Sequence, residues 1–148
     1  MTIMIRRADY EDATPLTALM HASSAYQGDY ATILRDYGVT PAQIDTDIVF
    51  LAEADGALAG FYSLIVTSEP ELDLMFVADA MHGRGIGRLL IAHMSEQARA
   101  LAIPSIRIVA HPPAQAFYES VGAKRVGTKP RTATAGWERP ILALPIAI

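Results

Sequence analysis

The feature that most constrains the fold is a glycine-rich turn between a strand-like segment and a long helix-like segment. Residues 71–77 alternate apolar and polar side chains, which is typical of a half-buried strand. Gly83, Gly85 and Gly87 follow, and residues 86–101 then repeat apolar side chains at helical spacing until Pro104 ends the helix. Residues 105–110 alternate again. The order strand, glycine turn, helix and strand predicts a βαβ unit.

A helix that begins at a glycine turn favours the binding of an anion. Its first N–H groups have no partner inside the helix and lie at the positive end of the helix dipole. Glycines let the main chain approach a phosphate or pyrophosphate closely, and Arg84 and Arg88 add positive charge. The alternative is that the glycines only make a tight connection. The turn lacks the Gly-Lys-Ser/Thr ending of a Walker loop, and its glycine spacing differs from that of a dinucleotide fingerprint.

Two motifs in this region resemble the GNAT superfamily of acetyl-CoA-dependent N-acetyltransferases. Residues 82–87, HGRGIG, are similar to the family's phosphate loop, Gln/Arg-x-x-Gly-x-Gly/Ala, except that His82 occupies the first position. Residues 111–122, HPPAQAFYESVG, resemble the signature Asn-x-x-Ala-x-x-Phe-Tyr-Glu-x-x-Gly from Ala114 onward, with His111 in place of the asparagine. The resemblance is close over residues 71–127 and only topological before them.

The resemblance implies that acetyl-CoA binds as the co-substrate and that no metal takes part. The pantetheine arm is expected beside the end of the strand at 71–77, and the diphosphate on the glycine turn. The expected cofactor-binding residues are Met75, Phe76, Val77, His82, Gly83, Arg84, Gly85, Ile86, Gly87, Arg88, His111, Ala114 and Phe117. For the two histidines the alternative is a partly exposed loop residue without a chemical role, and for Phe117 it is simple core packing.

Transfer of an acetyl group to an amine sets chemical requirements that few residues here can meet. An alkylamine with a pKa of about 10.4 is protonated at neutral pH and must lose a proton before it attacks. The resemblance implies that Tyr118 protonates the departing thiolate and that Glu71 is the general base, with Asp73 as its substitute. It also implies an oxyanion donor among the main-chain N–H groups of residues 75–77. The alternatives are a packing role for Tyr118 and a plain strand-edge charge for Glu71.

The acceptor is expected to be a primary amine on a small molecule, an amino acid or a protein. In proteins of this family the segment after the first helix closes over the acceptor, so Tyr26, Gln27, Asp29 and Tyr30 are candidate contacts. Specificity is expected in two loops, at residues 26–37 and 129–137. The alternative function is a non-catalytic module that binds or senses acyl-CoA.

Composition narrows the remaining classes of protein. A length of 148 residues with 51% hydrophobic and 19% charged residues predicts a single domain over residues 1–148. The net charge of −4 gives no basis for a nucleic-acid partner. The absence of cysteine excludes disulfides, thiolate metal sites and a cysteine-linked acyl-enzyme. No signal-like or membrane-spanning apolar run is present, so we expect a cytoplasmic protein without a membrane partner.

The rest of the chain predicts the other elements of one sheet. Strands are expected at residues 3–7, at 48–53 and 58–66 around the hairpin pair Asp55-Gly56, at 124–128 and within 138–148. Helices are expected from Asp9 and at residues 114–121. The predicted fold class is α/β (α+β), a GNAT-like mixed sheet of six or seven strands with helices on both faces. Pro145 predicts that the last strand is an edge strand. The apolar residues 141–148 at this end of the chain offer a surface for a homodimer.

Overall fold

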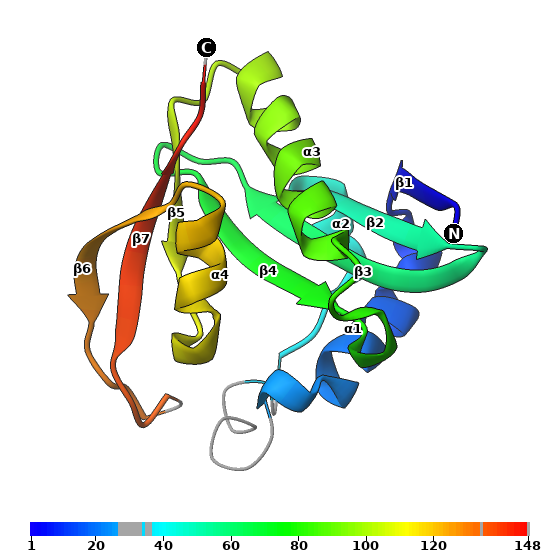
Figure 1. The fold of residues 1–148 in the computed structure, drawn as a ribbon, viewed down its shortest axis with the longest axis horizontal. Helices are drawn as coiled ribbons and strands as arrows, with labels where there is room; N and C mark the ends of the chain where they lie inside the picture. Colours follow the sequence, from blue (N-terminus) through cyan, green and yellow to red (C-terminus); the bar gives the residue numbers. More distant parts are fainter. Residues whose placement is uncertain (27–33, 35–36, 134, 148) are drawn as a thin grey trace.

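The computed structural model of the protein describes residues 1–26, 34, 37–133 and 135–147. Among them, seven strands form one sheet in the order β1-β2-β3-β4-β5-β7-β6 (Figure 1). All neighbours pair antiparallel except β4 and β5, which are parallel. The mixed sheet predicted from the sequence is therefore confirmed. The strands are β1 (Ile3–Arg7), β2 (Ile48–Ala54), β3 (Ala57–Ile65), β4 (Glu71–Val77), β5 (Ser105–Val109), β6 (Lys124–Lys129) and β7 (Arg139–Pro145).

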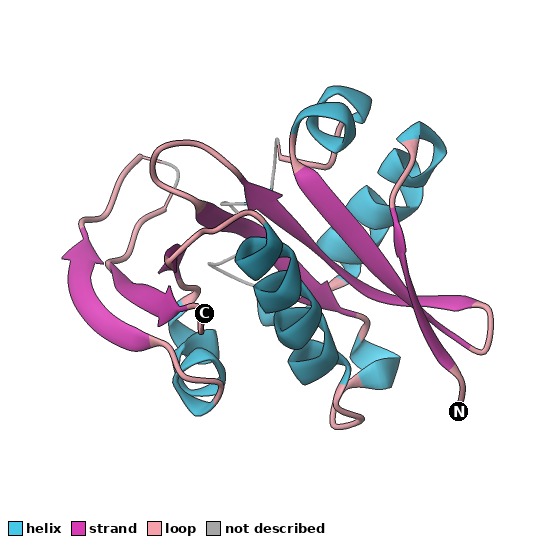
Figure 2. Cartoon of the chain, turned by 90° about the horizontal axis from the view of Figure 1, so that it is seen from above, coloured by secondary structure: helices cyan, strands magenta, loops and turns pink. Residues whose placement is uncertain are grey.

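Helices cover both faces of the sheet, α1 and α2 on one and α3 and α4 on the other (Figure 2). Each face buries its own apolar cluster. Leu90 and Met94 of α3 lie in one cluster, and Leu16 and Met20 of α1 lie in the other. The helices are α1 (Ala13–Ala22), α2 (Pro41–Thr46), α3 (Ile86–Ala100) and α4 (Gln115–Ser120), with short 3-10 turns η1 (Tyr10–Asp12), η2 (Ser24–Tyr26), η4 (Asp79–Met81) and η5 (Pro112–Ala114).

The longest of these helices, α3, packs against the sheet along one side only. Its buried residues, Ile86, Leu90, Ile91, Met94 and Ala98, repeat every three to four positions, as an amphipathic helix requires. Within the described ranges no helix is both long enough and apolar enough to cross a bilayer.

The hairpin between β2 and β3 forms at the Asp55-Gly56 pair, as predicted. Both residues adopt positive φ angles, 49° and 84°, which the tight turn between right-twisted strands requires. Ala54 and Ala57 are paired at the start of the hairpin, and strand β3 continues from there between β2 and β4.

Strand β4 contains a bulge at Asp73, which the regular alternation of residues 71–77 did not reveal. Leu72 pairs with Leu64 and Leu74 pairs with Ser63, so Asp73 has no partner on β3. The extra residue reverses the faces: Leu72 packs in the cluster beneath α3, whereas Leu74 packs in the cluster beneath α1. A bulge bends its strand and locally ends regular pairing, and the bend falls where β4 leaves β5.

Strands β4 and β5 separate soon after they meet. They share one paired position, Glu71 with Arg107, and the Arg107 N–H donates to the Pro70 carbonyl at 2.9 Å. Beyond it the two halves of the sheet diverge (Figure 1). The residues of β4 after the bulge therefore face a gap on one side, which positions the site described below.

The prediction that the last strand is an edge strand is wrong. Strand β7 lies between β5 and β6, and β6 is the edge. Pro145 is the last residue of β7, and pairing with β6 stops at Ala143, so the missing N–H of the proline interrupts no pairing with β6. Proline at a strand end is compatible with a central strand, and its position carried no information about the edge.

Candidate active site

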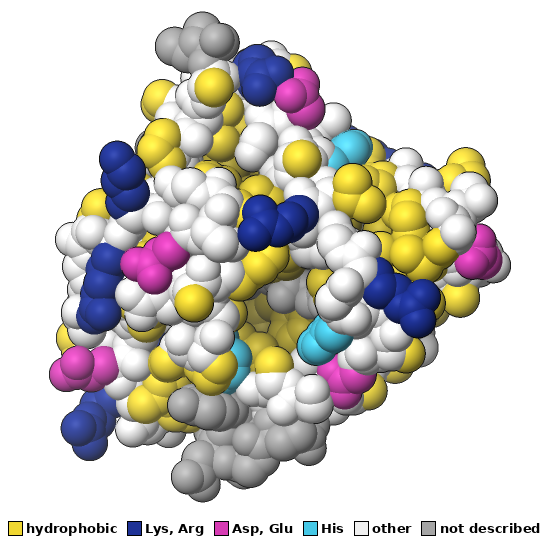
Figure 3. Space-filling model, in the orientation of Figure 1, with side chains coloured by type: hydrophobic (Ala, Val, Ile, Leu, Met, Phe, Trp, Pro, Cys, Tyr) yellow, Lys and Arg dark blue, Asp and Glu magenta, His cyan; other side chains and the backbone are white. Residues whose placement is uncertain are grey.

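A cleft opens where β4 and β5 separate. Its larger part is a cavity of about 620 Å³ between the end of β4, the start of α3 and α4. In the space-filling view it is a hollow in the middle of the face, with hydrophobic side chains inside and histidines at its border (Figure 3). Of the residues predicted to bind the cofactor, twelve line it, namely Met75, Phe76, Val77, His82, Gly83, Gly85, Ile86, Gly87, Arg88, His111, Ala114 and Phe117.

The floor of this cavity at the start of α3 is made of main chain. Gly85 caps the helix in a left-handed conformation, φ 79°, and no side chain caps the helix end. Leu89 is the first residue of the helix whose N–H has a backbone acceptor, the Gly85 carbonyl at 3.1 Å. Within the described part of the chain, the N–H groups of residues 86–88 have none. Three amide donors at the positive end of a helix dipole are suited to an anion.

Gly87 allows a neighbouring aromatic ring to approach this floor. A Cβ atom at position 87 would lie 3.0 Å from Cζ of Phe117, closer than side-chain carbons normally approach. A side chain at position 87 would therefore require the Phe117 ring to shift by a few tenths of an ångström. Phe117 also contacts Tyr118 edge-on, with ring centroids 5.4 Å apart.

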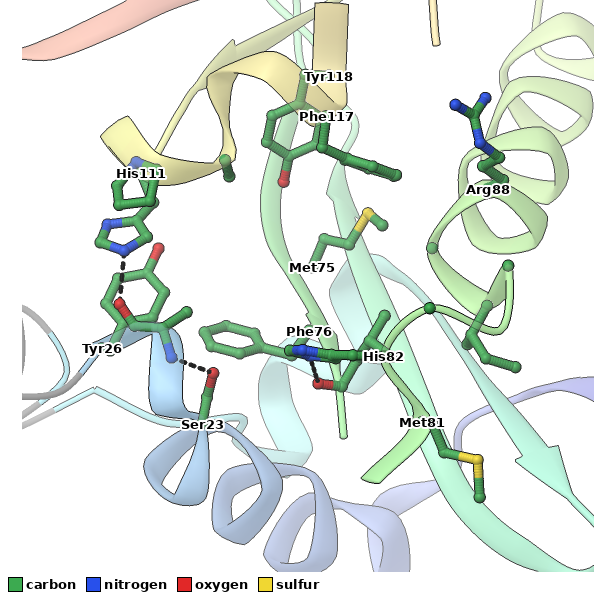
Figure 4. Close-up of a pocket in the computed structure, with 18 residues that line it drawn as sticks. Ser23, Tyr26, Met75, Phe76, Met81, His82, Arg88, His111, Phe117 and Tyr118 are labelled. Carbon is green, nitrogen blue, oxygen red and sulfur yellow. Dashed lines mark hydrogen bonds between the residues drawn. The ribbon is translucent and has the colours of Figure 1, made fainter. Parts of the chain in front are cut away.

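The charged side chains of the turn lie in different directions. Arg88 lines the cavity and donates to Oγ of Ser120 on α4 at 3.2 Å. Arg84, the thirteenth predicted residue, has its guanidinium near Sδ of Met1 and does not line the cavity. His82 donates from Nε2 to the Val77 carbonyl at 3.0 Å, and 3.9 Å separates it from Asp79 (Figure 4).

The main chain of β4 presents polar groups to the cleft. The N–H of Ala78 donates to Ala59 on β3, so the Val77 carbonyl points the other way, where His82 meets it. Because successive residues of a strand alternate in direction, Met75 directs its N–H to the same side. No strand pairs with that side, since β5 has already diverged.

Tyr118 lies where the two parts of the cleft meet. Its side chain is only 8% exposed, and its hydroxyl points into the cavity toward Met75 (Figure 4). Burial raises the pKa of Tyr118, and the nearby Tyr26 raises it further, so the phenol keeps its proton throughout the neutral range.

Tyr26 and His111 form a bridge across the cleft. Their rings stack with centroids 4.0 Å apart, and Nε2 of His111 donates to the Ala25 carbonyl at 2.6 Å. Tyr26 also contacts Phe76, at 5.4 Å. Burial lowers the pKa of His111, although the hydrogen bond to Ala25 acts in the opposite direction. Burial raises the pKa of Tyr26 to about 12. The bridge is therefore neutral at physiological pH.

A smaller cavity of about 260 Å³ continues from the first. The two share five lining residues, Tyr26, Met75, Phe76, His111 and Tyr118. Both carboxylates predicted as bases line the smaller one. Asp73 accepts hydrogen bonds from the Tyr37 hydroxyl at 2.5 Å and from Nε2 of Gln43 at 2.8 Å. Glu71 lies 3.8 Å from the Arg107 guanidinium.

Of the four predicted acceptor contacts, the structure locates one. Tyr26 lines both cavities, whereas Gln27, Asp29 and Tyr30 lie outside the described residues. Arg139 lines the smaller cavity and was missed, because nothing in the sequence separates it from other arginines. Met81 and Pro113 line the larger cavity and were missed as well. Met81 directly precedes the motif at residues 82–87 and Pro113 lies within the one at residues 111–122, and those positions were the available signal. No group of three or more His, Cys, Asp or Glu among the described residues is placed to hold a metal ion.

Comparison with solved structures shows the same fold in proteins of low sequence identity. The ribosomal-protein-S18-alanine N-acetyltransferase of Escherichia coli is 19% identical, with a TM-score of 0.75 over 99% of this chain and 96% of that one. The PaiA N-acetyltransferase of Thermoplasma acidophilum, solved in complex with coenzyme A, is also 19% identical, with a TM-score of 0.80 over 98% and 99% of the two chains. No curated protein matches the chain.

The family comparison covers most of the cleft. The model of the acetyltransferase (GNAT) domain matches residues 39–137, more than half of the chain, from the start of α2 to the loop before β7. That range includes the splayed strands, the glycine turn and Tyr118. The protein belongs to the GNAT family of acetyltransferases.

Proposed function

We propose that the protein transfers the acetyl group of acetyl-CoA to a primary amine, with both substrates bound at once. The observation that carries this proposal is the continuity of the cleft. It runs from the unpaired amides of residues 86–88, past the main chain of Met75 and the buried Tyr118 hydroxyl, to the carboxylates of the smaller cavity. An anion site, a proton donor and a proton acceptor thus border one connected space.

The larger cavity fits coenzyme A by the chemistry of its donors. Amides 86–88 and Arg88 offer positive charge to the diphosphate, and Gly87 adds no side chain of its own to that floor. Met75 offers a main-chain N–H on an edge with no paired strand, which suits the amide-bearing pantetheine arm. The PaiA N-acetyltransferase of Thermoplasma acidophilum, which shares the fold, was solved in complex with coenzyme A, and this supports coenzyme A as the ligand. When bound, acetyl-CoA supplies an acetyl thioester.

The residues around the junction handle the protons. Glu71 accepts the proton that the amine loses as its nitrogen bonds to the acetyl carbon, directly or through water. Tyr118 gives its phenolic proton to the sulfur as the carbon–sulfur bond breaks, and its raised pKa keeps that proton available. Met75 donates its N–H to the carbonyl oxygen while negative charge develops there. Asp73 is committed to Tyr37 and Gln43, so Glu71 is the better placed base.

Thiol release from acetyl-CoA, measured with a panel of primary amines, tests the proposal. We expect amine-dependent release, and protection from thermal unfolding by coenzyme A but not by ATP or NAD. Protection without release from any amine would support the alternative of a non-catalytic acyl-CoA-binding module. Equal protection by all three nucleotides would contradict both.

A further inference from the structure

The smaller cavity carries opposite charges on its two walls. Strand β4 contributes Glu71 and Asp73, and the β6–β7 pair contributes Lys129 and Arg139. These strands belong to the two diverging halves of the sheet (Figure 1). A ligand in this cavity therefore meets carboxylates on one side and cations on the other.

The carboxylates of the acidic wall already have hydrogen-bond or ion-pair partners within the protein. Asp73 accepts two hydrogen bonds, and Glu71 has Arg107 as a counter-ion on β5. Neither carboxylate needs a cation from the opposite wall, and no ion pair joins the two walls among the described residues.

The two cations of the basic wall, in contrast, have no carboxylate partner among the described residues. Lys129 and Arg139 are register partners on adjacent strands, so two like charges face each other directly, an arrangement that destabilises a sheet. Both side chains are partly buried. No carboxylate of the described residues lies within ion-pair distance of either, and Nε of Arg139 is buried without a hydrogen-bond partner. An anion between them would relieve the repulsion and provide the missing acceptor.

The basic pair also lies close to the reacting end of the cleft. The positive charge of Arg139 acts on the Tyr26 hydroxyl and opposes the rise in the pKa of Tyr26 that burial causes. Tyr26 lines both cavities, as does Tyr118. An anion held by Arg139 is thus near the junction, whereas the amides proposed for the cofactor diphosphate line only the larger cavity.

We infer that the acceptor is a small amine that also carries a carboxylate, such as an amino acid, and that Lys129 and Arg139 bind that carboxylate. This inference rests on the proposed acetyl transfer and names the substrate class for it. The amine of the acceptor lies toward Glu71 and Tyr118 while its carboxylate lies between the two cations. A volume of about 260 Å³ is slightly below the range of about 300–1,000 Å³ that ligand pockets occupy, and favours a free small molecule.

The substrate test compares the L-amino acids with their α-carboxamides, which keep the amine and the side chain but lose the negative charge. Thiol release from acetyl-CoA is measured for each pair. We expect kcat/KM for at least one amino acid to exceed that of its amide by about 10- to 100-fold, the range of a hydrogen-bonded charge pair. Equal or higher values for all amides would overturn the inference and leave the transfer activity intact.

Variants of the basic wall give the second test. Arg139→Gln and Lys129→Gln are expected to raise KM for the preferred amino acid about 10-fold or more and to leave the amide unchanged. Arg139→Lys keeps the charge but loses the planar guanidinium, so an intermediate KM is expected. Arg131→Gln and Lys124→Gln remove the same charges at exposed positions outside both cavities and serve as matched controls. Melting temperatures show whether each variant folds.

A binding measurement separates failure of the inference from failure of the proposed function. Thermal protection by the amino acids is measured with coenzyme A present, in the wild type and in Arg139→Gln. If no amine supports turnover but amino acids protect only the wild type, the inferred carboxylate site is supported and the proposed transfer activity is contradicted. If neither amino acids nor amides protect, or if Arg139→Gln weakens coenzyme A binding instead, the assignment of the basic pair to the acceptor is wrong.

Discussion

The two cavities of the cleft differ in which part of the chain supplies their polar groups. In the larger one the donors are mostly main-chain N–H groups, at residues 86–88 and at Met75, and the glycines there add no side chains of their own. In the smaller one the polar groups are side chains, Glu71, Asp73, Lys129 and Arg139, carried by three different strands.

This difference predicts how each half responds to substitution. A main-chain site is disturbed by changes in backbone conformation or by an added Cβ, whereas removal of a nearby charge has a small effect. A side-chain site is disturbed by the loss of single functional groups. Tyr118 borders both cavities, which fits the role in proton transfer that we propose for its hydroxyl.

The largest effect is expected from Tyr118→Phe. Loss of a proton donor in the transition state lowers kcat by about 100-fold or more, in the range of general acid catalysis. Because the ring remains, coenzyme A affinity should change less than about two-fold by calorimetry. Tyr10→Phe is the control, because Tyr10 is exposed and lines neither cavity. A kcat within three-fold of the wild type would remove Tyr118 from the reaction.

Glu71→Gln and Asp73→Asn separate the two carboxylates of the side-chain half. Glu71→Gln should lower kcat about 10- to 100-fold near neutral pH without changing the melting temperature, because its carboxylate has only the long contact to Arg107. Asp73→Asn should lower stability by about 1–3 kcal/mol, since two donors lose a charged acceptor. The reverse pattern would make Asp73 the base.

A matched glycine pair isolates the main-chain half. Gly85 and Gly56 both have positive φ, 79° and 84°, and in both cases a Cβ would meet nothing within 4 Å. Alanine at either position should therefore cost about 1–2 kcal/mol of backbone strain. Only Gly85→Ala should also weaken coenzyme A binding, about 10-fold, because it reorients the amides at the start of α3. Equal coenzyme A affinity in the two variants would contradict a main-chain anion site.

The same distinction explains what could be predicted from the sequence. Gly83, Gly85 and Gly87 indicate a tight turn at a helix start, so it was predictable that these residues line the larger cavity. Their role in binding a cofactor stays a prediction. Tyr118 followed from the neighbouring motif. The bulge at Asp73 was not predictable from the sequence. Residues 71–77 alternate apolar and polar side chains as in a regular strand, although Leu72 and Leu74 pack in different clusters.

The smaller cavity depends on contacts between residues far apart in the chain. Lys129 and Arg139 become neighbours only through the register of β6 and β7, and the position of β7 was itself mispredicted from Pro145. Similarly, Gln43 of α2 reaches Asp73 across the face of the sheet. Side chains that converge from separate elements leave no local pattern, whereas glycines that shape a loop do.

Two histidines with lowered pKa values, His111 and His93, are expected to make the stability of the protein depend on pH. Burial lowers the pKa of His111 and of His93 below 6.5. The unfolded chain therefore takes up protons as the pH falls through 6.5 before the folded protein does, so stability present above pH 6.5 is lost below it. Thermal melts between pH 7.5 and 5.5 should show this loss, and His111→Asn should reduce it. An unchanged pH dependence in His111→Asn would mean that the Tyr26–His111 bridge tolerates the charge.

The smallest effect is expected from the two arginines of the glycine turn. Arg88 lines the larger cavity and has a hydrogen bond to Ser120, whereas Arg84 extends toward Met1. If the amides hold the diphosphate, Arg88→Gln should weaken coenzyme A binding only about three- to five-fold, and Arg84→Gln less than about two-fold, since exposed charge pairs contribute about 0–1 kcal/mol. Both effects should shrink at higher salt. A loss above 50-fold in either variant would mean that a side chain, not the main chain, provides the anion site, and the contrast between the two cavities would then disappear.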